Sequence, residues 1–168
     1  MPRQGSLFQA SFNYLLFKES FSSVRLYEDG KLDLDKPVAD YVTSWPQKHP
    51  AITTKHLASH TAGVRHYKEE KGNDKDQTTH DTKYPEFYSN KPYNTIEEAL
   101  EVFKNDDLLC EPGTEFNYTT HGFTVLSAVI EAAAKEPFVK HMKKLFRALG
   151  LNNTYLDENE PIIPFRAK

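Results

Sequence analysis

Tyr118 is the residue whose position in this 168-residue sequence best suits chemistry. It follows Glu111-Pro112-Gly113-Thr114, where the Pro-Gly pair favours a type II turn. It precedes an apolar stripe that predicts a helix starting just after Thr119 or Thr120. N–H groups at the start of that helix would favour a phenolate. Taken alone, a tyrosine is still more often a packing residue.

His56 and His60 are four residues apart and would face the same way on a helix, as zinc ligands do in a His-Glu-x-x-His pattern. Leu57 stands where the catalytic glutamate belongs, and the spacing indicates no third ligand. The sequence therefore predicts neither a metal site nor a cofactor. The two histidines are interpreted as capping or loop-bracing residues.

Other histidines and one serine invite a catalytic interpretation that their positions do not support. Ser59 beside His60 looks like part of a hydrolytic triad, but neighbouring side chains point apart, and triads are assembled from distant segments. His66 and His121 are interpreted as hydrogen-bonded surface or rim residues.

Composition excludes several classes of protein. Hydrophobic residues make up 38% and charged residues 27%, which matches neither a disordered tail nor a membrane protein. The net charge of −3 provides no positive field for nucleic acid. No stretch approaches the roughly 20 apolar residues of a membrane span. Cys110, the only cysteine, cannot form an internal disulfide.

The elements that must position Tyr118 are mainly helices, and no run of strands long enough for a closed sheet is visible. Helices are predicted near residues 37–42, 53–58, 96–106, 120–133 and 137–149. Residues 9–27 show a broken helical pattern, residues 32–35 alternate as in an exposed extended stretch, and residues 68–94 have the composition of a long surface loop. The fold class is therefore mainly α.

Three ordered blocks carry a family resemblance. They are Leu-Asp-Leu-Asp-Lys-Pro-Val at 32–38, Ile52-Thr53 with His-Leu-Ala-Ser-His-Thr-Ala-Gly at 56–63, and Pro-Gly-Thr-x-Phe-x-Tyr-Thr-Thr-x-Gly-Phe at 112–123. Together they resemble the serine beta-lactamase and penicillin-binding-protein-like family, and most of all its mitochondrial branch in animals. The resemblance covers about Leu26 to Asp157.

The resemblance implies roles for two residues. In this family a serine of a Ser-x-x-Lys motif is acylated, and a lysine and a tyrosine move its proton. Tyr118 matches that catalytic tyrosine. Thr120 matches the substrate-binding position, where the family usually carries Asn or Ser. The block from His60 to Gly63 implies a structural turn that braces the floor of the site.

The nucleophile of the family is missing from this sequence. No serine is followed three residues later by lysine, and Ser11 and Lys18 would lie about 10.5 Å apart along a helix. The sequence also reaches Lys168 before the family's Lys/His-x-Gly strand. We therefore expect a divergent segment at 1–27 and a partial domain at 28–168, the helical lobe of the α+β fold with its sheet largely missing.

Two functions follow as hypotheses. The first is a fragment of a mitochondrial, peptidase-type serine hydrolase linked to lipid metabolism, inactive in this form. The alternative is a non-catalytic helical module that binds a partner of the parent protein or self-associates through uncovered apolar faces. A peptide-like substrate is implied only for the full-length family. Whether residues 1–27 target an organelle, and whether the chain folds stably alone, stay open.

Overall fold

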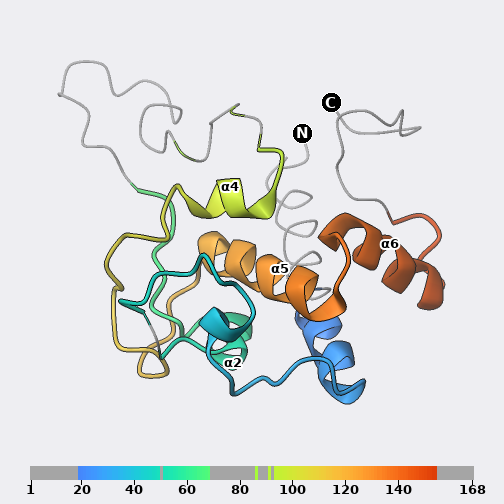
Figure 1. The fold of residues 1–168 in the computed structure, drawn as a ribbon, viewed down its shortest axis with the longest axis horizontal. Helices are drawn as coiled ribbons and strands as arrows, with labels where there is room; N and C mark the ends of the chain where they lie inside the picture. Colours follow the sequence, from blue (N-terminus) through green and yellow to red (C-terminus); the bar gives the residue numbers. More distant parts are fainter. Residues whose placement is uncertain (1–18, 50, 69–85, 87–90, 92, 155–168) are drawn as a thin grey trace, which may run out of the picture.

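The computed structural model describes residues 19–49, 51–68, 86, 91 and 93–154. Residues 19–28 are helical, and the elements that follow are η1 (Val38–Asp40, a 3-10 helix), α2 (Thr54–Ala58), α4 (Ile96–Leu100), α5 (Thr120–Ala134) and α6 (Phe138–Ala148) (Figure 1). Within the described ranges the only β pairing is an isolated bridge between Pro37 and Thr53. The mainly helical prediction is confirmed for this part of the chain, while the absence of a sheet stays a prediction.

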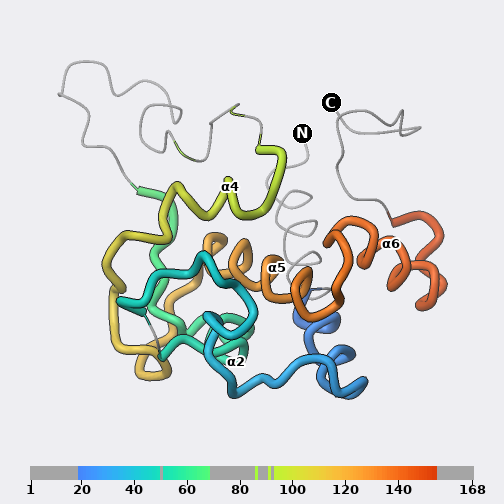
Figure 2. The backbone as a smooth tube through the Cα atoms, in the orientation of Figure 1, coloured from blue at the N-terminus to red at the C-terminus, as the bar shows by residue number. Residues whose placement is uncertain are grey.

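Helix α5 is the centre of the fold. It packs against α2, α4 and α6, and Figure 1 shows α4 and α2 on opposite sides of it. Its Leu126, Val129 and Ile130 are completely buried, as is Leu57 of α2. Figure 2 traces the connection from the 19–28 helix, which passes on the α2 side before the chain enters α2. Burial of these aliphatic side chains supplies most of the driving force for folding.

The helix starts follow the capping residues of the sequence. Thr53 accepts the His56 N–H and donates its own N–H to His56 Nδ1, a reciprocal capping box that starts α2. Thr119 caps α5 by accepting the Gly122 N–H at 3.2 Å. Thr95 caps α4. The predicted starts of these helices are confirmed.

The helix predicted over 96–106 is shorter than expected, because α4 ends at Leu100. Hydrogen-bonded turns continue the chain, with Val102 N–H bound to the Ala99 carbonyl and Phe103 N–H to the Leu100 carbonyl. The Asn-Asp-Asp run at 105–107 is unfavourable in a helix interior. Asp106 is instead held by a buried arginine, described below.

Helix α6 ends as its sequence predicts. Gly150 has a φ of 70°, the Leu151 N–H binds the Phe146 carbonyl at 2.8 Å, and the Gly150 N–H binds the Arg147 carbonyl at 3.1 Å. These two bonds form a Schellman motif. Helix α5 ends without a glycine. Its C-cap residue is Lys135, which has a φ of 54°.

Two other predictions have different outcomes. The extended stretch predicted at 32–35 is wrong, because Leu34 and Asp35 lie in a turn and the Asp35 N–H binds Asp33 Oδ1 at 3.0 Å. Asx bonds of this kind compete with extended pairing. The helical pattern at 9–18 and most of the loop predicted at 68–94 lie outside the described residues.

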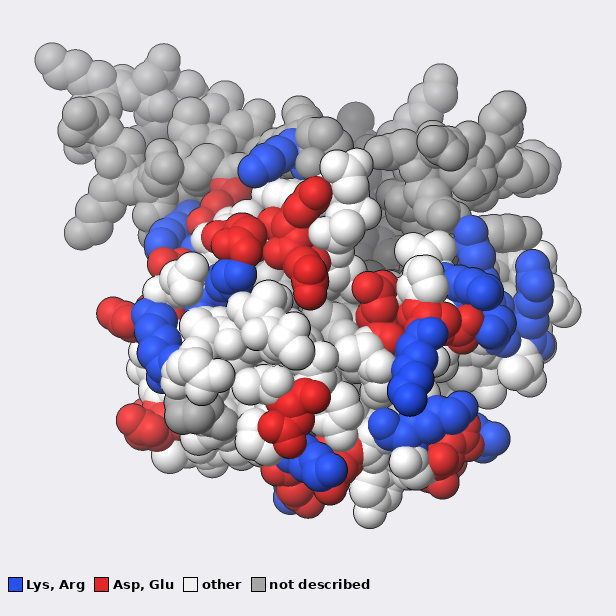
Figure 3. All heavy atoms as spheres, in the orientation of Figure 1, with Lys and Arg blue, Asp and Glu red and all other residues white. Residues whose placement is uncertain are grey.

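Charged side chains gather over two of the helices. Figure 3 shows acidic side chains over α4, which carries Glu97 and Glu98, and basic side chains over α6.

Three apolar side chains on the 19–28 helix, spaced at three residues, are partly exposed. Phe21, Val24 and Tyr27 are 37%, 47% and 54% exposed. None of the helices in the described part of the chain is long and apolar enough to cross a membrane.

Candidate functional site

Two segments of chain, residues 60–63 and 109–117, are hydrogen-bonded to each other and form the floor of the candidate site. We call this pair of segments the brace. Backbone bonds join Asn117 N–H to the His60 carbonyl at 2.8 Å, Gly113 N–H to the Thr61 carbonyl at 2.7 Å, and Leu109 N–H to the Gly63 carbonyl at 2.8 Å. The block from His60 to Gly63 therefore holds the segment that leads into Tyr118. This confirms the bracing role predicted for that block.

The turn before Tyr118 has the predicted form. Gly113 has a φ of 87°, and the Thr114 N–H binds the Glu111 carbonyl at 3.2 Å, as a type II turn requires. A Cβ on Gly113 would lie 3.1 Å from His56 Nε2, so the α2 histidine packs directly beneath the turn. His56 is thus a capping and bracing residue, as predicted.

Tyr118 lies at the surface between two histidines. Its side chain is 38% exposed, and its ring centroid is 4.7 Å from that of His60 and 5.8 Å from that of His66. Partial burial, with a smaller contribution from Tyr67, raises the pKa of the phenol. The expected phenolate is therefore wrong: the Tyr118 hydroxyl favours its protonated form.

The first N–H groups of α5 bind two histidines and the capping threonine. The Thr119 N–H lies 3.3 Å from His60 Nδ1, and the Thr120 N–H lies 3.5 Å from His66 Nδ1. Together with the Gly122 N–H, which Thr119 caps, these donors already have acceptors. Two imidazoles thus accept hydrogen bonds at the positive end of the helix. The sequence did not indicate these contacts, because the partners are more than fifty residues apart.

Thr120 lies beside Tyr118 at the start of α5 and is half-buried. Its Oγ1 is 3.0 Å from His66 Nδ1. His66 itself is exposed and hydrogen-bonded, which confirms the rim position predicted for it. Partial burial of the rings lowers the pKa values of both His60 and His66, which favours the neutral rings that can accept hydrogen bonds.

His121 is not a surface or rim residue, and that prediction is wrong. It is 7% exposed and stacks on Phe103 with ring centroids 4.2 Å apart. Its Nε2 lies 3.3 Å from Glu86 Oε2. Burial lowers the pKa of His121 to about 4, against the opposing effect of Glu86.

A buried ionic cluster supports the site from behind. The Arg65 guanidinium binds Asp106 Oδ2 through Nε at 2.6 Å and both Glu86 oxygens at 2.8 and 2.9 Å. The Arg65 side chain is 9% exposed. The Arg65 carbonyl also accepts the Thr119 hydroxyl at 2.7 Å. Hydrogen bonds from Arg65 hold the pKa values of Glu86 and Asp106 below their ordinary range, against the effect of burial.

The low pKa of His121 predicts a specific acid sensitivity. The unfolded chain binds the His121 proton below its ordinary pKa of 6.5, whereas the folded chain binds it only near 4, so stability is full above about pH 6.5 and falls as the pH drops toward 4. We expect His121 to lower the free energy of unfolding by about 2–3 kcal/mol between pH 6.5 and pH 4.

Urea unfolding at about pH 7 and about pH 4.5 measures this loss. The variant His121→Gln keeps an N–H donor for Glu86 but does not titrate, so its stability should fall less with acid than that of the wild type. His60, His66 and His141 also have lowered pKa values and contribute equally to both proteins. Equal acid losses in the two proteins would contradict the assignment.

Ser59 has a local structural role. Its hydroxyl donates to the Lys55 carbonyl at 2.8 Å and lies 2.8 Å from Thr61 Oγ1. His60, at a φ of 57°, has turned away from the α2 axis and contacts Phe116, Tyr118 and Phe123 instead. The adjacent pair is therefore not part of a triad, as the sequence indicates.

Comparisons with known proteins fit this geometry. The beta-lactamase family model matches residues 24–168. The human mitochondrial serine beta-lactamase-like protein LACTB is 31% identical over 198 residues, covering 86% of this chain, and its bovine counterpart is 30% identical. The chain spans 36% of the length of each of these relatives.

Solved structures show the same fold. A penicillin-binding protein from Bacillus halodurans superposes with a TM-score of 0.70 at 24% identity, covering 88% of this chain and 43% of its own. The hydrolase EstCE1 superposes with a TM-score of 0.62 at 26% identity, covering 79% of this chain and 35% of its own. With the family match spanning most of its length, this chain belongs to the beta-lactamase family.

Proposed function

We propose that this chain is the helical lobe of a beta-lactamase-like serine hydrolase and that it carries out no acyl transfer by itself. The observation that carries the proposal is the surroundings of Tyr118: a protonated phenol packed between His60 and His66, in a sequence with no Ser-x-x-Lys motif. Acyl transfer needs a hydroxyl with a proton acceptor within hydrogen-bonding distance.

The surroundings of three of the described serines support this proposal. Ser23 and Ser127 donate to the Glu19 and Phe123 carbonyls of their own helices. The Ser22 hydroxyl lies 2.9 Å from His141 Nε2, and His141 Nδ1 lies 3.6 Å from a Glu136 oxygen. This Ser-His-Glu arrangement has triad-like order, but Ser22 is completely buried, so no substrate carbonyl reaches its oxygen.

Tyr118 and Thr120 are proposed to keep the positions of the family's proton-relay tyrosine and substrate-binding residue. Both lie on the same short segment at the start of α5, above the brace. In the complete fold Tyr118 would move the proton of the attacking serine, and the Thr120 hydroxyl would donate to a substrate carbonyl. In this chain the Thr120 hydroxyl is engaged by His66.

The names of the relatives suggest the setting. Because the human and bovine proteins are named mitochondrial, we propose that this chain acts in mitochondria as well. We propose a peptide-like substrate and a link to lipid metabolism for the parent enzyme, with residues 1–27 as a divergent segment and residues 28–168 as the family domain.

A fluorophosphonate probe tests the silent-lobe proposal directly. We expect no serine of the purified chain to be labelled, and hydrolysis of small peptide and ester substrates to stay at the buffer rate. Tyr118→Phe should change neither result. A full-length family member serves as the positive control. Stoichiometric labelling, or turnover that Tyr118→Phe abolishes, would show that the chain is an active hydrolase.

A second candidate function is self-association, and exposed apolar side chains favour it. Leu109 and Phe116, which flank the turn before Tyr118, are 62% and 69% exposed. A penicillin-binding-protein homologue of this fold from Pyrococcus abyssi is described as octameric. Sedimentation equilibrium tests this second function. An apparent mass that rises with protein concentration supports self-association, and Phe116→Ser should then lower the apparent mass.

A further inference from the structure

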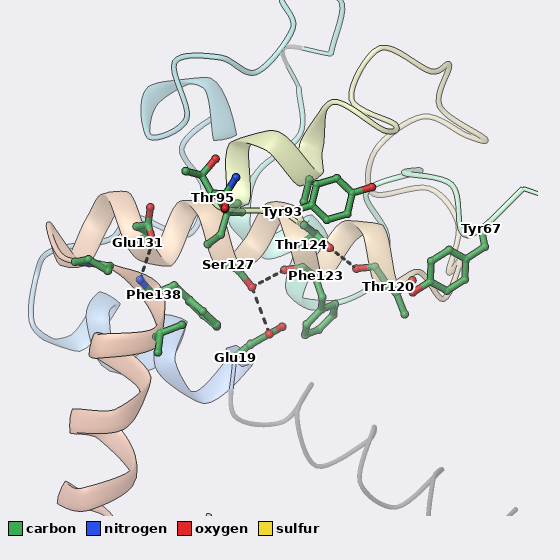
Figure 4. Close-up of a pocket in the computed structure, with 15 residues that line it drawn as sticks. Glu19, Tyr67, Tyr93, Thr95, Thr120, Phe123, Thr124, Ser127, Glu131 and Phe138 are labelled. Atoms are coloured by element: carbon green, nitrogen blue, oxygen red, sulfur yellow. Dashed lines mark hydrogen bonds between the residues drawn. The ribbon is translucent and has the colours of Figure 1, made fainter. Parts of the chain in front are cut away.

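A cleft of about 700 Å³ opens beside the candidate site, between the 19–28 helix, α4, α5 and the start of α6 (Figure 4). It includes Thr120 in its wall but not Tyr118, His60 or His66. Its size is that of sites for small organic ligands. The side chains that line it determine which ligand chemistry fits.

Glu19 is a buried acid in the wall of this cleft. The residue is 6% exposed, and one carboxyl oxygen, Oε1, accepts the Ser127 hydroxyl at 3.3 Å. The other oxygen, Oε2, is buried and has no hydrogen-bond partner among the described residues. Figure 4 shows the carboxyl next to Ser127 and Phe123. Burial raises the pKa of Glu19 to about 8, against the effect of Ser127. A buried carboxyl with an unpaired oxygen is costly unless a ligand completes it.

The rest of the wall is aromatic and acidic. The rings of Tyr67, Tyr93, Phe123 and Phe138 face the same cleft. A second acid, Glu131, lines it and binds the Phe138 N–H at 2.7 Å. The described lining includes no lysine, arginine or histidine. Aromatic faces and carboxylates both attract cations, and such walls disfavour anions.

We propose that this cleft is a binding site for a small organic ammonium ion, with the ammonium at Glu19 Oε2 and an apolar tail against the aromatic side chains. Binding of the ammonium would favour the ionised carboxylate, so Glu19 would release its proton to solvent as the ammonium enters. The ammonium would then complete the hydrogen bonding of the carboxylate and would be held by ion pairing and cation–π contact. The cleft shares Thr120 with the candidate site, but its wall contains neither Tyr118 nor the brace.

Calorimetric titration of the full chain with three matched probes tests the charge preference. The probes are phenethylammonium, the neutral 2-phenylethanol and the anionic phenylacetate. We expect phenethylammonium to bind about tenfold more tightly than 2-phenylethanol, and phenylacetate not to bind. Equal affinity for the amine and the alcohol would overturn the proposal, as would preferential binding of the anion or no binding of the amine.

Variants locate the site. Glu19→Gln should remove the preference for the ammonium, whereas Glu97→Gln, an exposed acid on α4 outside the cleft, should leave it unchanged. Circular dichroism and a thermal melt verify that both variants are folded. Undiminished amine binding by folded Glu19→Gln would place the amine elsewhere and refute the proposal. If Glu19→Gln does not fold, the three-probe comparison on the wild type decides.

Discussion

Replacing Arg65 with alanine is expected to lower the free energy of unfolding by about 3–5 kcal/mol, because it leaves two carboxylates without their shared cation. Glu86 binds both terminal nitrogens of Arg65, and Asp106 binds its Nε. Lys68 also approaches Asp106, at 3.1 Å, but it is exposed and cannot replace the buried guanidinium. The substitution also affects His121, because His121 contacts the same carboxylate, that of Glu86.

Urea unfolding followed by circular dichroism measures this loss, and Arg25→Ala is the matched control. Arg25 pairs with Glu28 and Asp29 at 3.8 and 3.4 Å, but its side chain is 58% exposed. Exposed pairs contribute roughly 0–1 kcal/mol, so the control should be nearly as stable as the wild type. Similar losses in the two variants would mean that the Arg65 cluster does not stabilise the fold.

Gly63→Ala is expected to lower the free energy of unfolding by about 3–5 kcal/mol, through a backbone clash combined with an unfavourable dihedral. Gly63 has a φ of 72°, and an added Cβ would lie 2.3 Å from the Cys110 carbonyl oxygen. The chain at Cys110 cannot retreat without breaking the bond from Leu109 N–H to the Gly63 carbonyl. The substitution therefore disrupts the brace beneath Tyr118.

Gly30→Ala separates the clash from the dihedral. Gly30 has a φ of 67°, close to that of Gly63, but an added Cβ there would have no neighbour within 4 Å. This control should therefore lose only about 1 kcal/mol. Thermal melts of both variants give the comparison. If Gly63→Ala were no less stable than Gly30→Ala, the contact with Cys110 would be looser than described.

Local signals in the sequence predicted the parts of the fold that neighbouring residues determine. Thr53, Thr95 and Thr119 mark helix starts because their hydroxyls bind N–H groups three residues ahead. Gly150 and the Pro-Gly pair at 112–113 mark reversals because they fit dihedrals that other residues resist. The family motifs likewise located the segment that carries Tyr118 and Thr120.

Contacts between distant residues were beyond the reach of such signals. Arg65, Glu86 and Asp106 have no periodic spacing, yet they meet in one cluster. The burial of His121 depends on Phe103 and Glu86, which approach it only when α5 packs on the turns after α4. The Tyr118 pKa was predicted in the wrong direction for the same reason, since partial burial raises it and the ring packs against two histidines remote in the sequence, His60 and His66.

Those two histidines also join segments of chain that are far apart in the sequence. His60 and His66 link the 60–66 segment to the opening turn of α5, while backbone bonds link the same segment to residues 109–117. Three pieces of chain are thus joined by hydrogen bonds around the start of α5. Because Thr120 binds His66, a substitution in the 60–66 segment would alter the position of Thr120 without touching it.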